Sequence, residues 1–219
     1  MLQNLVWPEI WQATWETLYM TGLSVIFTTI IGLPLGILLV ITGPKGLIQN
    51  QAVYQMLSVI VNILRSIPFV ILLILMIPVT EVLVGQAIGV QAAIPPLVVA
   101  AAPFYARLVE TSIREVDFGM IEAAQSMGAN IRQIIFKVLL PEAKAGIIAG
   151  LTITTISLIS YSAISGVIGG GGLGDLAIRY GYQRFELNVM LIATAILVII
   201  VQILQMIGDR VVIRVSRRK

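Results

Sequence analysis

The stretch EAAQSMGANIRQIIFKVLLPEA, residues 122–143, lies between two long apolar segments and is rich in polar side chains. Before its proline it carries seven polar or charged residues, which are Glu122, Gln125, Ser126, Asn130, Arg132, Gln133 and Lys137. The apolar residues recur at helical spacing and fall near one face of a helical wheel; they are Ile121, Ala124, Met127, Ile131, Ile134, Ile135 and Val138. The pattern predicts an amphipathic, water-facing helical segment between two membrane-spanning helices.

Two signals inside this stretch predict a pair of short helices joined by a tight turn. Gly128 interrupts the apolar pattern, as a residue just past a helix end does. Asn130, followed three residues later by Gln133, resembles a capping pair that begins a second helix, and Pro141 is expected to end the regular pattern. Such a pair either rests on the lipid surface or docks its exposed face into a partner, and the local pattern leaves both interpretations open.

The composition indicates that lipid is the solvent for most of the chain. Hydrophobic residues make up 58% of the sequence and charged residues 11%, against roughly a quarter charged in soluble domains. There is no cysteine and no histidine, which excludes disulfides, thiolate chemistry and the usual proton shuttle near neutral pH. The net charge of +3 is modest, and the basic residues gather near span ends, which indicates membrane orientation and not nucleic-acid binding.

Five apolar segments are long enough to cross a hydrocarbon core, which takes about 20 residues. We expect an all-α membrane protein with one domain over residues 1–219 and spans at about 18–41, 58–80, 91–110, 145–167 and 187–208. The third span should begin near Pro95 and Pro96 and kink at Pro103. Three glycines in the first span should allow close helix packing; they are Gly22, Gly32 and Gly36.

The distribution of basic residues predicts how the spans are oriented. Five spans put the termini on opposite sides, and the basic tail at 210–219 predicts a cytoplasmic C-terminus and an N-terminus outside. The loop at about 117–141 then faces the cytoplasm, where eleven basic residues lie, against Arg179 and Arg184 outside.

Arg65 is the basic residue that this division leaves unassigned. In mid-bilayer it would cost about 2.5–3.5 kcal/mol on insertion scales and would mark a functional site. Alternatively, residues 51–64 form an interfacial or cytoplasm-side helix and the true span begins near Ser66. Arg65 would then lie near the cytoplasmic interface, where it would extend its charge to water or pair with an acid. We prefer the interfacial position, and the other remains an alternative.

The polar stretch is similar to the EAA loop of ABC-importer permeases. Glu122, Ala123 and Ala124, then Gly128, then Leu140 and Pro141 stand in the register of that motif, with Val138 where the family often has isoleucine. Three further segments resemble the permease subunit of methionine ABC importers, so that the resemblance covers nearly the whole chain; they are NILRSIPFVILLILMIP (62–78), AAPFYARLVE (101–110) and YSAISGVIGGGGLGDLAIRYGYQRFE (161–186).

This resemblance implies a type I ABC importer permease of the bacterial inner membrane, with a coupling helix in the loop between the third and fourth spans. It implies a second copy of the chain, two ATP-binding-cassette ATPase subunits and an extracytoplasmic methionine-binding lipoprotein as partners. The ATPase would bind ATP and Mg²⁺, while this chain would bind no cofactor, metal or nucleic acid and would not itself be an enzyme. The transported solute would be methionine, D- or L-, carried by alternating access; another small amino acid or related solute is the alternative.

A polar stripe on the fourth span points toward a glycine-rich segment. The stripe has helical spacing and consists of Thr154, Ser157, Tyr161 and Ser165. It either forms interhelical hydrogen bonds or lines the translocation path. The glycines are interpreted as an outer turn, either a plain loop or a structured lip of that path; they are Gly169, Gly170, Gly171, Gly172 and Gly174.

Other function classes fit the sequence less well. Gly169, Gly171 and Gly174 satisfy the pattern G-x-G-x-x-G, but they follow an apolar helix instead of a strand, and no acid lies about 20 residues later. A P-loop lysine is also missing, so we expect no ATP site on this chain. A secondary transporter usually carries intramembrane carboxylates or repeated halves, and an enzyme needs an acid–base pair, a nucleophile or a metal cluster; neither pattern is found.

Overall fold

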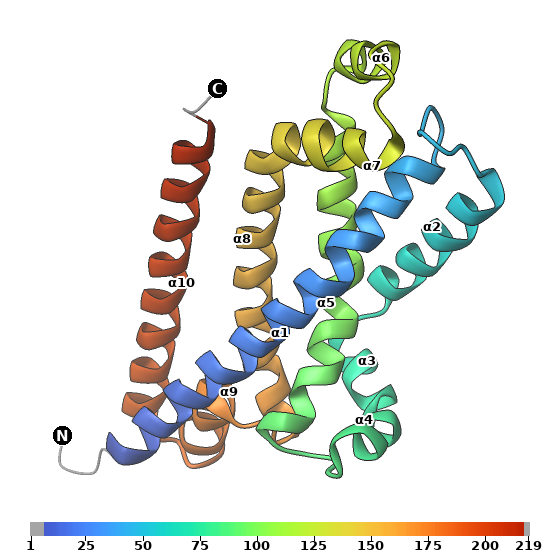
Figure 1. Ribbon diagram of the computed structural model, residues 1–219. Coiled ribbons are helices and arrows are strands. Elements are labelled where there is room, and N and C mark those ends of the chain that lie inside the picture. The colour runs from blue at the N-terminus through green and yellow to red at the C-terminus, as the bar shows by residue number, and fades with distance from the viewer. Residues whose placement is uncertain (1–6, 217–219) are drawn as a thin grey trace.

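The computed structural model describes residues 7–216, and the regular structure within this range is helical, with no strand. Four long helices form the frame, namely α1 (Trp7–Thr42), α5 (Val90–Arg114), α8 (Leu140–Ser165) and α10 (Leu187–Ser216). Figure 1 shows α1 running diagonally across α8 and α5, with α10 at one edge of the molecule. Each of the four lies in a helical stretch long and apolar enough to cross a membrane.

α1 and α5 pack closely because two glycines of α1 face the backbone of α5. A Cβ placed on Gly32 would lie 2.9 Å from the Ala102 carbonyl oxygen, and one on Gly36 would lie 2.7 Å from that of Ala106. Close packing at these two positions is therefore confirmed, because any larger residue would push the helices apart. Gly22 does not contribute, since nothing lies within 4 Å of its added Cβ.

The second apolar segment is bent. α2 (Gln51–Ser66) and α3 (Phe69–Leu75) meet at 103°, and α4 (Ile77–Val84) follows directly. Ile67 has an extended backbone before Pro68, as the ring of a following proline requires. The expected span at 58–80 is thus divided among three helices. Residues 7–216 contain four helical stretches long and apolar enough to span a membrane, or five if the bent pair is counted as one span.

α5 extends further than the charges in the sequence indicated. It continues to Arg114 and contains all three of its prolines, Pro95, Pro96 and Pro103. Arg114, which lies beyond the expected end of the span near residue 110, belongs to this helix, as does Arg107. α6 (Phe118–Ser126) begins only three residues after it ends.

Pro141 does not end the helical pattern, in contrast to the expectation. α7 (Ile131–Ile134), a π-helical turn (Ile135–Leu139) and α8 form one continuous path, and Pro141 lies in the first turn of α8. A proline removes one N–H and crowds the carbonyl four residues earlier. Just before the proline the helix widens into a π turn, in which the Leu140 N–H donates to the Ile135 carbonyl five residues earlier. The helix therefore changes direction without breaking (Figure 1).

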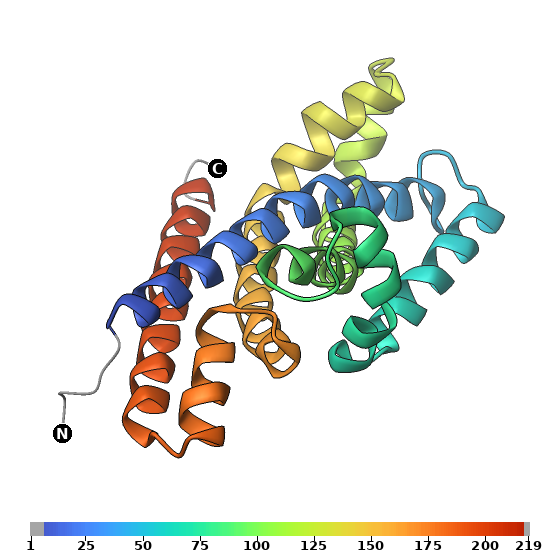
Figure 2. The same cartoon turned by 90° about the horizontal axis from the view of Figure 1, so that it is seen from below.

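The two ends of the bundle carry different elements. At one end, called the α6 end, α1, α5 and α10 finish and α6 is located; at the other, called the α9 end, α1 and α10 begin (Figure 1). The α9 end also holds α9 (Gly172–Leu176) and a second π-helical segment (Ala177–Gln183). Seen from below in Figure 2, α9 lies on the side of α10, and α3 and α4 lie on the side of α2.

Candidate functional site

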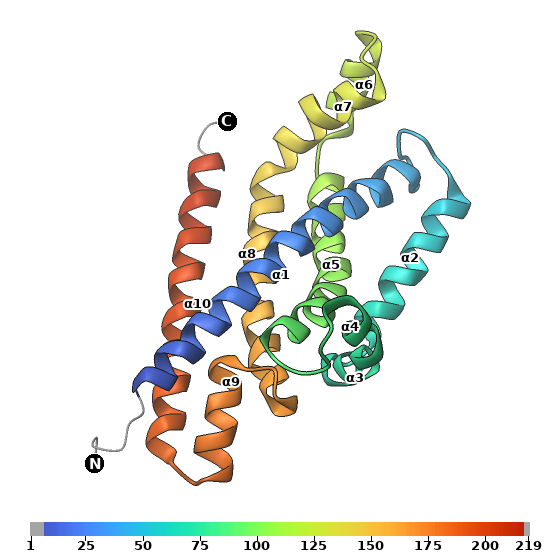
Figure 3. The same cartoon turned by 60° about the horizontal axis from the view of Figure 1, so that its bottom comes forward.

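α6 extends beyond the ends of the long helices (Figure 3). The Asp117 carboxylate caps its first turn and accepts from the Gly119 N–H at 2.6 Å. Gly128 closes the following turn with φ +76°, a left-handed conformation that glycine adopts without a Cβ penalty. Asn130 and Gln133 bond reciprocally in a capping box that starts α7. The helix, turn and capped second helix predicted from the sequence are confirmed.

The two faces of α6 differ in burial. Ala124 is buried, and Ile121 packs beside it against the same core cluster. Glu122 and Ala123 are exposed, so the first two residues of the motif lie outside the core. Met127 was expected on the buried face, but it is 82% exposed, so that assignment was wrong. Phe118 is exposed as well, so the outer surface of α6 and its C-terminal turn combines apolar side chains with the polar Glu122, Gln125 and Ser126.

The buried side of α6 is connected to the long helices through one apolar cluster. This cluster combines Ala124 with side chains from α1, α5, α7, the π turn and α8, including Ile41, Ile113, Ile134, Ile135, Leu139 and Ala143. Leu140 is half-buried and Pro141 exposed at the start of α8. A rigid displacement of α6 would therefore act on three long helices at once, since a close-packed cluster transmits strain.

The polar stripe on α8 satisfies its hydroxyls within its own helix. Thr154 and Ser165 are fully buried and donate to the carbonyls of Gly150 and Ser162, at 2.8 and 2.6 Å. The Ser157 hydroxyl donates to the Ile153 carbonyl at 3.0 Å. Within residues 7–216, these three hydroxyls therefore donate to carbonyls of α8 itself and not to another helix. Tyr161 does link helices, because its ring stacks on Phe69 of α3 with centroids 4.7 Å apart.

The glycine-rich segment is a structured turn fixed against α1. Gly171 and Gly172 have φ of +75° and +76°, and added Cβ atoms there would collide with neighbouring side chains. The Glu16 carboxylate accepts from the Gly172 N–H, and the Thr17 hydroxyl accepts from the Leu173 N–H, each at 2.9 Å. These bonds cap the start of α9 with side chains from another helix. The segment is therefore held in place by α1.

Other contacts hold the same segment from both sides. Gly174 approaches α8 so closely that an added Cβ would lie 2.2 Å from the Ala163 carbonyl oxygen. On the α1 side, Tyr180 hydrogen-bonds to the Glu9 carboxylate, and this bond raises the pKa of the Tyr180 phenol. Gly169 and Gly170 lie next to Ile88 and Ser165, so all five glycines of the predicted lip belong to one packed region.

Replacing Thr17 by valine should weaken this region. Thr17 is buried, and valine has nearly the same shape but cannot accept the Leu173 N–H bond. A buried N–H left without a partner costs about 1–3 kcal/mol. We expect faster hydrogen exchange at the Leu173 amide and a lower unfolding temperature of the purified chain.

Thr14→Val serves as the matched control, because the Thr14 hydroxyl bonds only to the Ile10 carbonyl of its own helix. It should leave exchange at Leu173 unchanged. Equal exchange rates in the two variants would contradict the capping role of Thr17.

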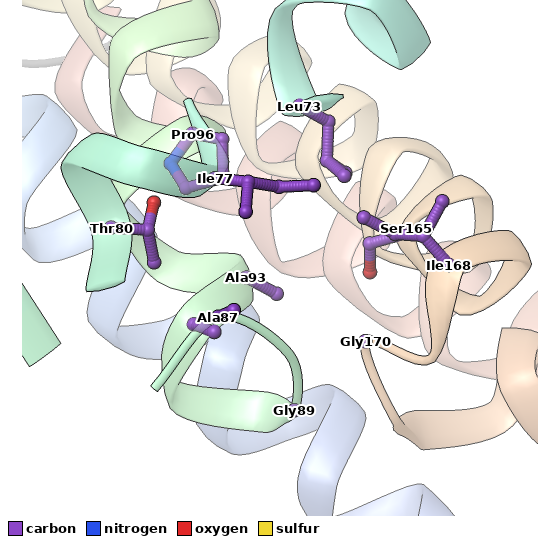
Figure 4. A pocket seen from close by; sticks show the side chains of 11 residues that line it. Leu73, Ile77, Thr80, Ala87, Gly89, Ala93, Pro96, Ser165, Ile168 and Gly170 are labelled. Carbon is purple, nitrogen blue, oxygen red and sulfur yellow. The ribbon is translucent and has the colours of Figure 1, made fainter. Parts of the chain in front are cut away.

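One cavity at the α9 end, where the polar stripe meets the glycine-rich segment, is small. Its lining comes from α3, α4, α5 and the end of α8, and includes Leu73, Thr80, Ala93, Ser165 and Gly170 (Figure 4). Its volume is about 10 Å³, which is about what one water molecule needs. The Thr80 hydroxyl is buried without a hydrogen-bond partner there. The stripe residue Ser165 and the lip residue Gly170 thus meet at a site too small for an amino acid.

A buried ion cluster on α5 was missed in the sequence. Glu110 is 3% exposed; one of its oxygens lies 2.6 Å from Arg107 and the other 2.9 Å from Arg114. Arg107 also donates to Ser58 and Asn62 of α2. The spacing of Arg107, Glu110 and Arg114 at three and four residues on one helix was the available signal.

Comparisons with known proteins place these features in a family. The model of the family described as binding-protein-dependent transport system inner membrane component matches residues 32–219. A methionine import system permease protein of Bacillus subtilis is 51% identical, with 98% of this chain and 97% of the relative covered. A probable D-methionine transport system permease protein of Vibrio cholerae is 50% identical, with 94% and 92% covered.

Solved structures agree with the sequence comparison. The chain superposes with a TM-score of 0.95 on a structure described as an inward-facing conformation of the MetNI methionine ABC transporter, at 49% identity, with 98% of this chain and 99% of that chain covered. A crystal structure of an amino acid ABC transporter with histidines gives a TM-score of 0.78 at 22% identity and covers 94% of each chain. The latter likeness concerns the fold alone.

Proposed function

The chain belongs to the family of binding-protein-dependent transport system inner membrane components, and we propose that it is the membrane-spanning permease subunit of an ATP-driven methionine importer. The observation that carries the proposal is the superposition on the MetNI methionine ABC transporter, which extends over 98% of this chain. Relatives that are about half identical over nearly the whole chain carry methionine-transport names.

The proposed assembly contains two copies of this chain and two ATPase subunits. The α6 end faces the cytoplasm and the α9 end faces outward, so α10 ends on the cytoplasmic side and α1 begins on the outer side. The excess of basic residues near the α6 end supports this orientation; part of that excess, Arg217, Arg218 and Lys219, lies outside the described residues. ATP and Mg²⁺ are bound by the ATPase subunits, and an extracytoplasmic lipoprotein delivers methionine at the α9 end.

α6 acts as the coupling helix in this proposal. Its exposed residues Glu122 and Ala123, with the apolar Phe118 and Met127 around them, are inserted into a cleft of the ATPase. Ala123 permits close approach, and the Glu122 carboxylate is available to a cation or a helix N-terminus of the partner. Closure of the ATPase pair on ATP moves α6, and the cluster around Ala124 passes this rigid-body motion to α1, α5 and α8.

The permease works by alternating access between an outward-open and an inward-open state. The small cavity at Ser165 and Gly170 suits a state in which the outer side is closed. Thr154, Ser157, Tyr161 and Ser165 approach the path at that side, and the glycine-rich lip, held by α1, moves with that helix. ATP binding opens the outer side to the binding protein, and hydrolysis returns the inward-open state.

Reconstituted uptake tests this function directly. Proteoliposomes holding the chain with its ATPase and binding protein should accumulate labelled methionine in the presence of ATP and Mg²⁺, and vesicles holding the chain alone should not. Preferential uptake of a different amino acid, with no competition by L- or D-methionine, would replace the substrate assignment. Uptake by the chain without an ATPase would contradict the transporter class.

A further inference from the structure

α2 presents three distinct sides. One apolar side is directed toward the bundle and contains the buried Val61. A second apolar side is exposed and includes Ile60 and Ile63, which are 47% and 56% exposed. Between them is a polar stripe, which stays within about 100° of helix circumference at about 100° per residue; it consists of Gln51, Gln55, Ser58, Asn62, Arg65 and Ser66.

The Arg65 side chain lies beside the middle part of α5, away from the α6 end. Its guanidinium carbon is 6.0 Å from the ring centroid of Phe104 on α5. Phe104 precedes Arg114, the last residue of α5, by ten positions, which corresponds to about 15 Å of helix at 1.5 Å per residue. With the cytoplasmic edge of the proposed membrane placed at Arg114, a hydrocarbon core of about 30 Å has Arg65 near its middle. The mid-bilayer alternative for Arg65 is therefore the one taken up here.

The region around Arg65 carries excess positive charge. Among residues 7–216, Arg65 forms no ion pair, whereas Glu110 is shared between Arg107 and Arg114. Arg107 also donates to Ser58 and to Asn62, the latter at 3.0 Å, which brings a second guanidinium to the stripe. An exposed, unpaired arginine at this depth needs water or an anionic partner, because hydrocarbon solvates neither its charge nor its five donors.

A dry contact between two copies would not meet this need. Packing the stripe on itself about a two-fold axis would offer Arg65 only the amides, hydroxyls and arginine of the same stripe and no carboxylate, since such an interface uses the same patch on both subunits. Lipid chains offer no acceptors. In a water-filled space, water molecules hydrogen-bond to the polar side chains of the stripe. A carboxylate is the ligand that a guanidinium binds with two parallel hydrogen bonds.

We propose that the polar stripe of α2 lines the water-filled translocation path and that the Arg65 guanidinium binds the carboxylate of the amino acid passing through it, an inference that rests on the proposed function. Ser58 and Asn62 position Arg107 beside this site. The Phe104 ring next to Arg65 offers an apolar, aromatic surface for a thioether side chain.

Cysteine accessibility tests the stripe, because the chain contains no cysteine of its own. Asn62→Cys and Arg65→Cys are placed on the stripe, and Ile60→Cys and Ile63→Cys on the exposed apolar side serve as matched controls one or two positions away. The complete complex, in inside-out vesicles, is treated with a charged, water-soluble thiosulfonate. The stripe cysteines should react at least about tenfold faster than the controls, because a charged reagent does not enter hydrocarbon.

Equal rates at all four positions would overturn the placement, and so would stripe cysteines that instead cross-link to the second copy on oxidation. In either case normal methionine uptake by the unsubstituted complex would leave the proposed function intact. If the unsubstituted complex does not take up methionine but the stripe cysteines still react faster, the methionine assignment is refuted and the placement of the stripe in a water-filled path is retained.

Substitutions that remove or keep the positive charge at Arg65 test its contact with the carboxylate. Arg65→Gln should lower methionine uptake at least about tenfold, a change of about 1.4 kcal/mol, while Arg65→Lys should retain a larger share. Methionine should slow the labelling of Asn62→Cys in the parent background and not in the Arg65→Gln background. Full uptake by Arg65→Gln, or equal protection in both backgrounds, would exclude the carboxylate contact.

Discussion

Ala123→Trp should abolish ATP-driven uptake while the chain still folds and inserts. Ala123 is exposed on α6, whereas its neighbour Ala124 is part of the buried cluster. An indole at Ala123 therefore has room in the free chain and none in a closely fitting cleft, where overpacking costs about 1–3 kcal/mol. We expect the ATPase to bind weakly or to hydrolyse ATP without transport. Co-purification of the subunits and uptake per ATP hydrolysed measure the effect.

A matched control separates docking from a general effect of an added indole. Ala52 is also an exposed alanine near the α6 end, but it is on the exposed apolar side of α2. Ala52→Trp should leave uptake and subunit assembly near normal. Normal coupling in Ala123→Trp, or an equal loss in Ala52→Trp, would remove the coupling role from α6.

Local signals were sufficient to predict the α6 region. The left-handed turn at Gly128 and the capping box of Asn130 and Gln133 depend on residues within four positions of one another. Met127 was misplaced because the wheel was continued through the turn, although Gly128 changes the direction of the chain. Pro141 was given too much weight for a related reason, since the chain widens into a π turn just before it and remains helical through it.

The bend after α2 could not be obtained from hydropathy. The segments on either side of Pro68 are both apolar, so a sliding average sees one span where the chain turns by 103°. A second span that starts at residue 58 also divides the polar stripe of α2 and separates Gln51 and Gln55 from Asn62 and Arg65. The periodicity was present in the sequence, and only the choice of boundaries concealed it.

Tertiary contacts account for the remaining differences. Glu16 and Thr17 meet the backbone of the glycine-rich segment across 156 positions of sequence, and no local pattern indicates that contact. The charges on α5 suggested a helix that ends early, because an unpaired charge is unfavourable in a span. Glu110 neutralises part of that charge inside the fold, which lets the helix continue to Arg114.

Glu110→Ala should therefore be the most destabilising single change in this set. Both oxygens of the buried carboxylate bind guanidinium groups, and Arg107 is itself only 19% exposed. Removing the carboxylate leaves a poorly solvated charge without its counter-ion, at a cost of about 3–5 kcal/mol. For a chain of this size about 1 kcal/mol shifts the unfolding temperature by about 2–4 °C. Thermal unfolding of the purified chain in detergent should show an unfolding temperature lowered by several times this amount.

The Asp175–Arg179 pair provides the comparison, because it has the same helical spacing but an arginine that is 49% exposed. Asp175→Ala should cost no more than about 1 kcal/mol, since water and salt screen a surface pair. If burial is what makes Glu110 important, Arg107→Gln combined with Glu110→Gln should be less destabilising than the sum of the two single changes, because the double variant leaves fewer unpaired charges in the fold. Strict additivity, or equal losses for Glu110→Ala and Asp175→Ala, would mean that α5 reaches Arg114 by packing alone.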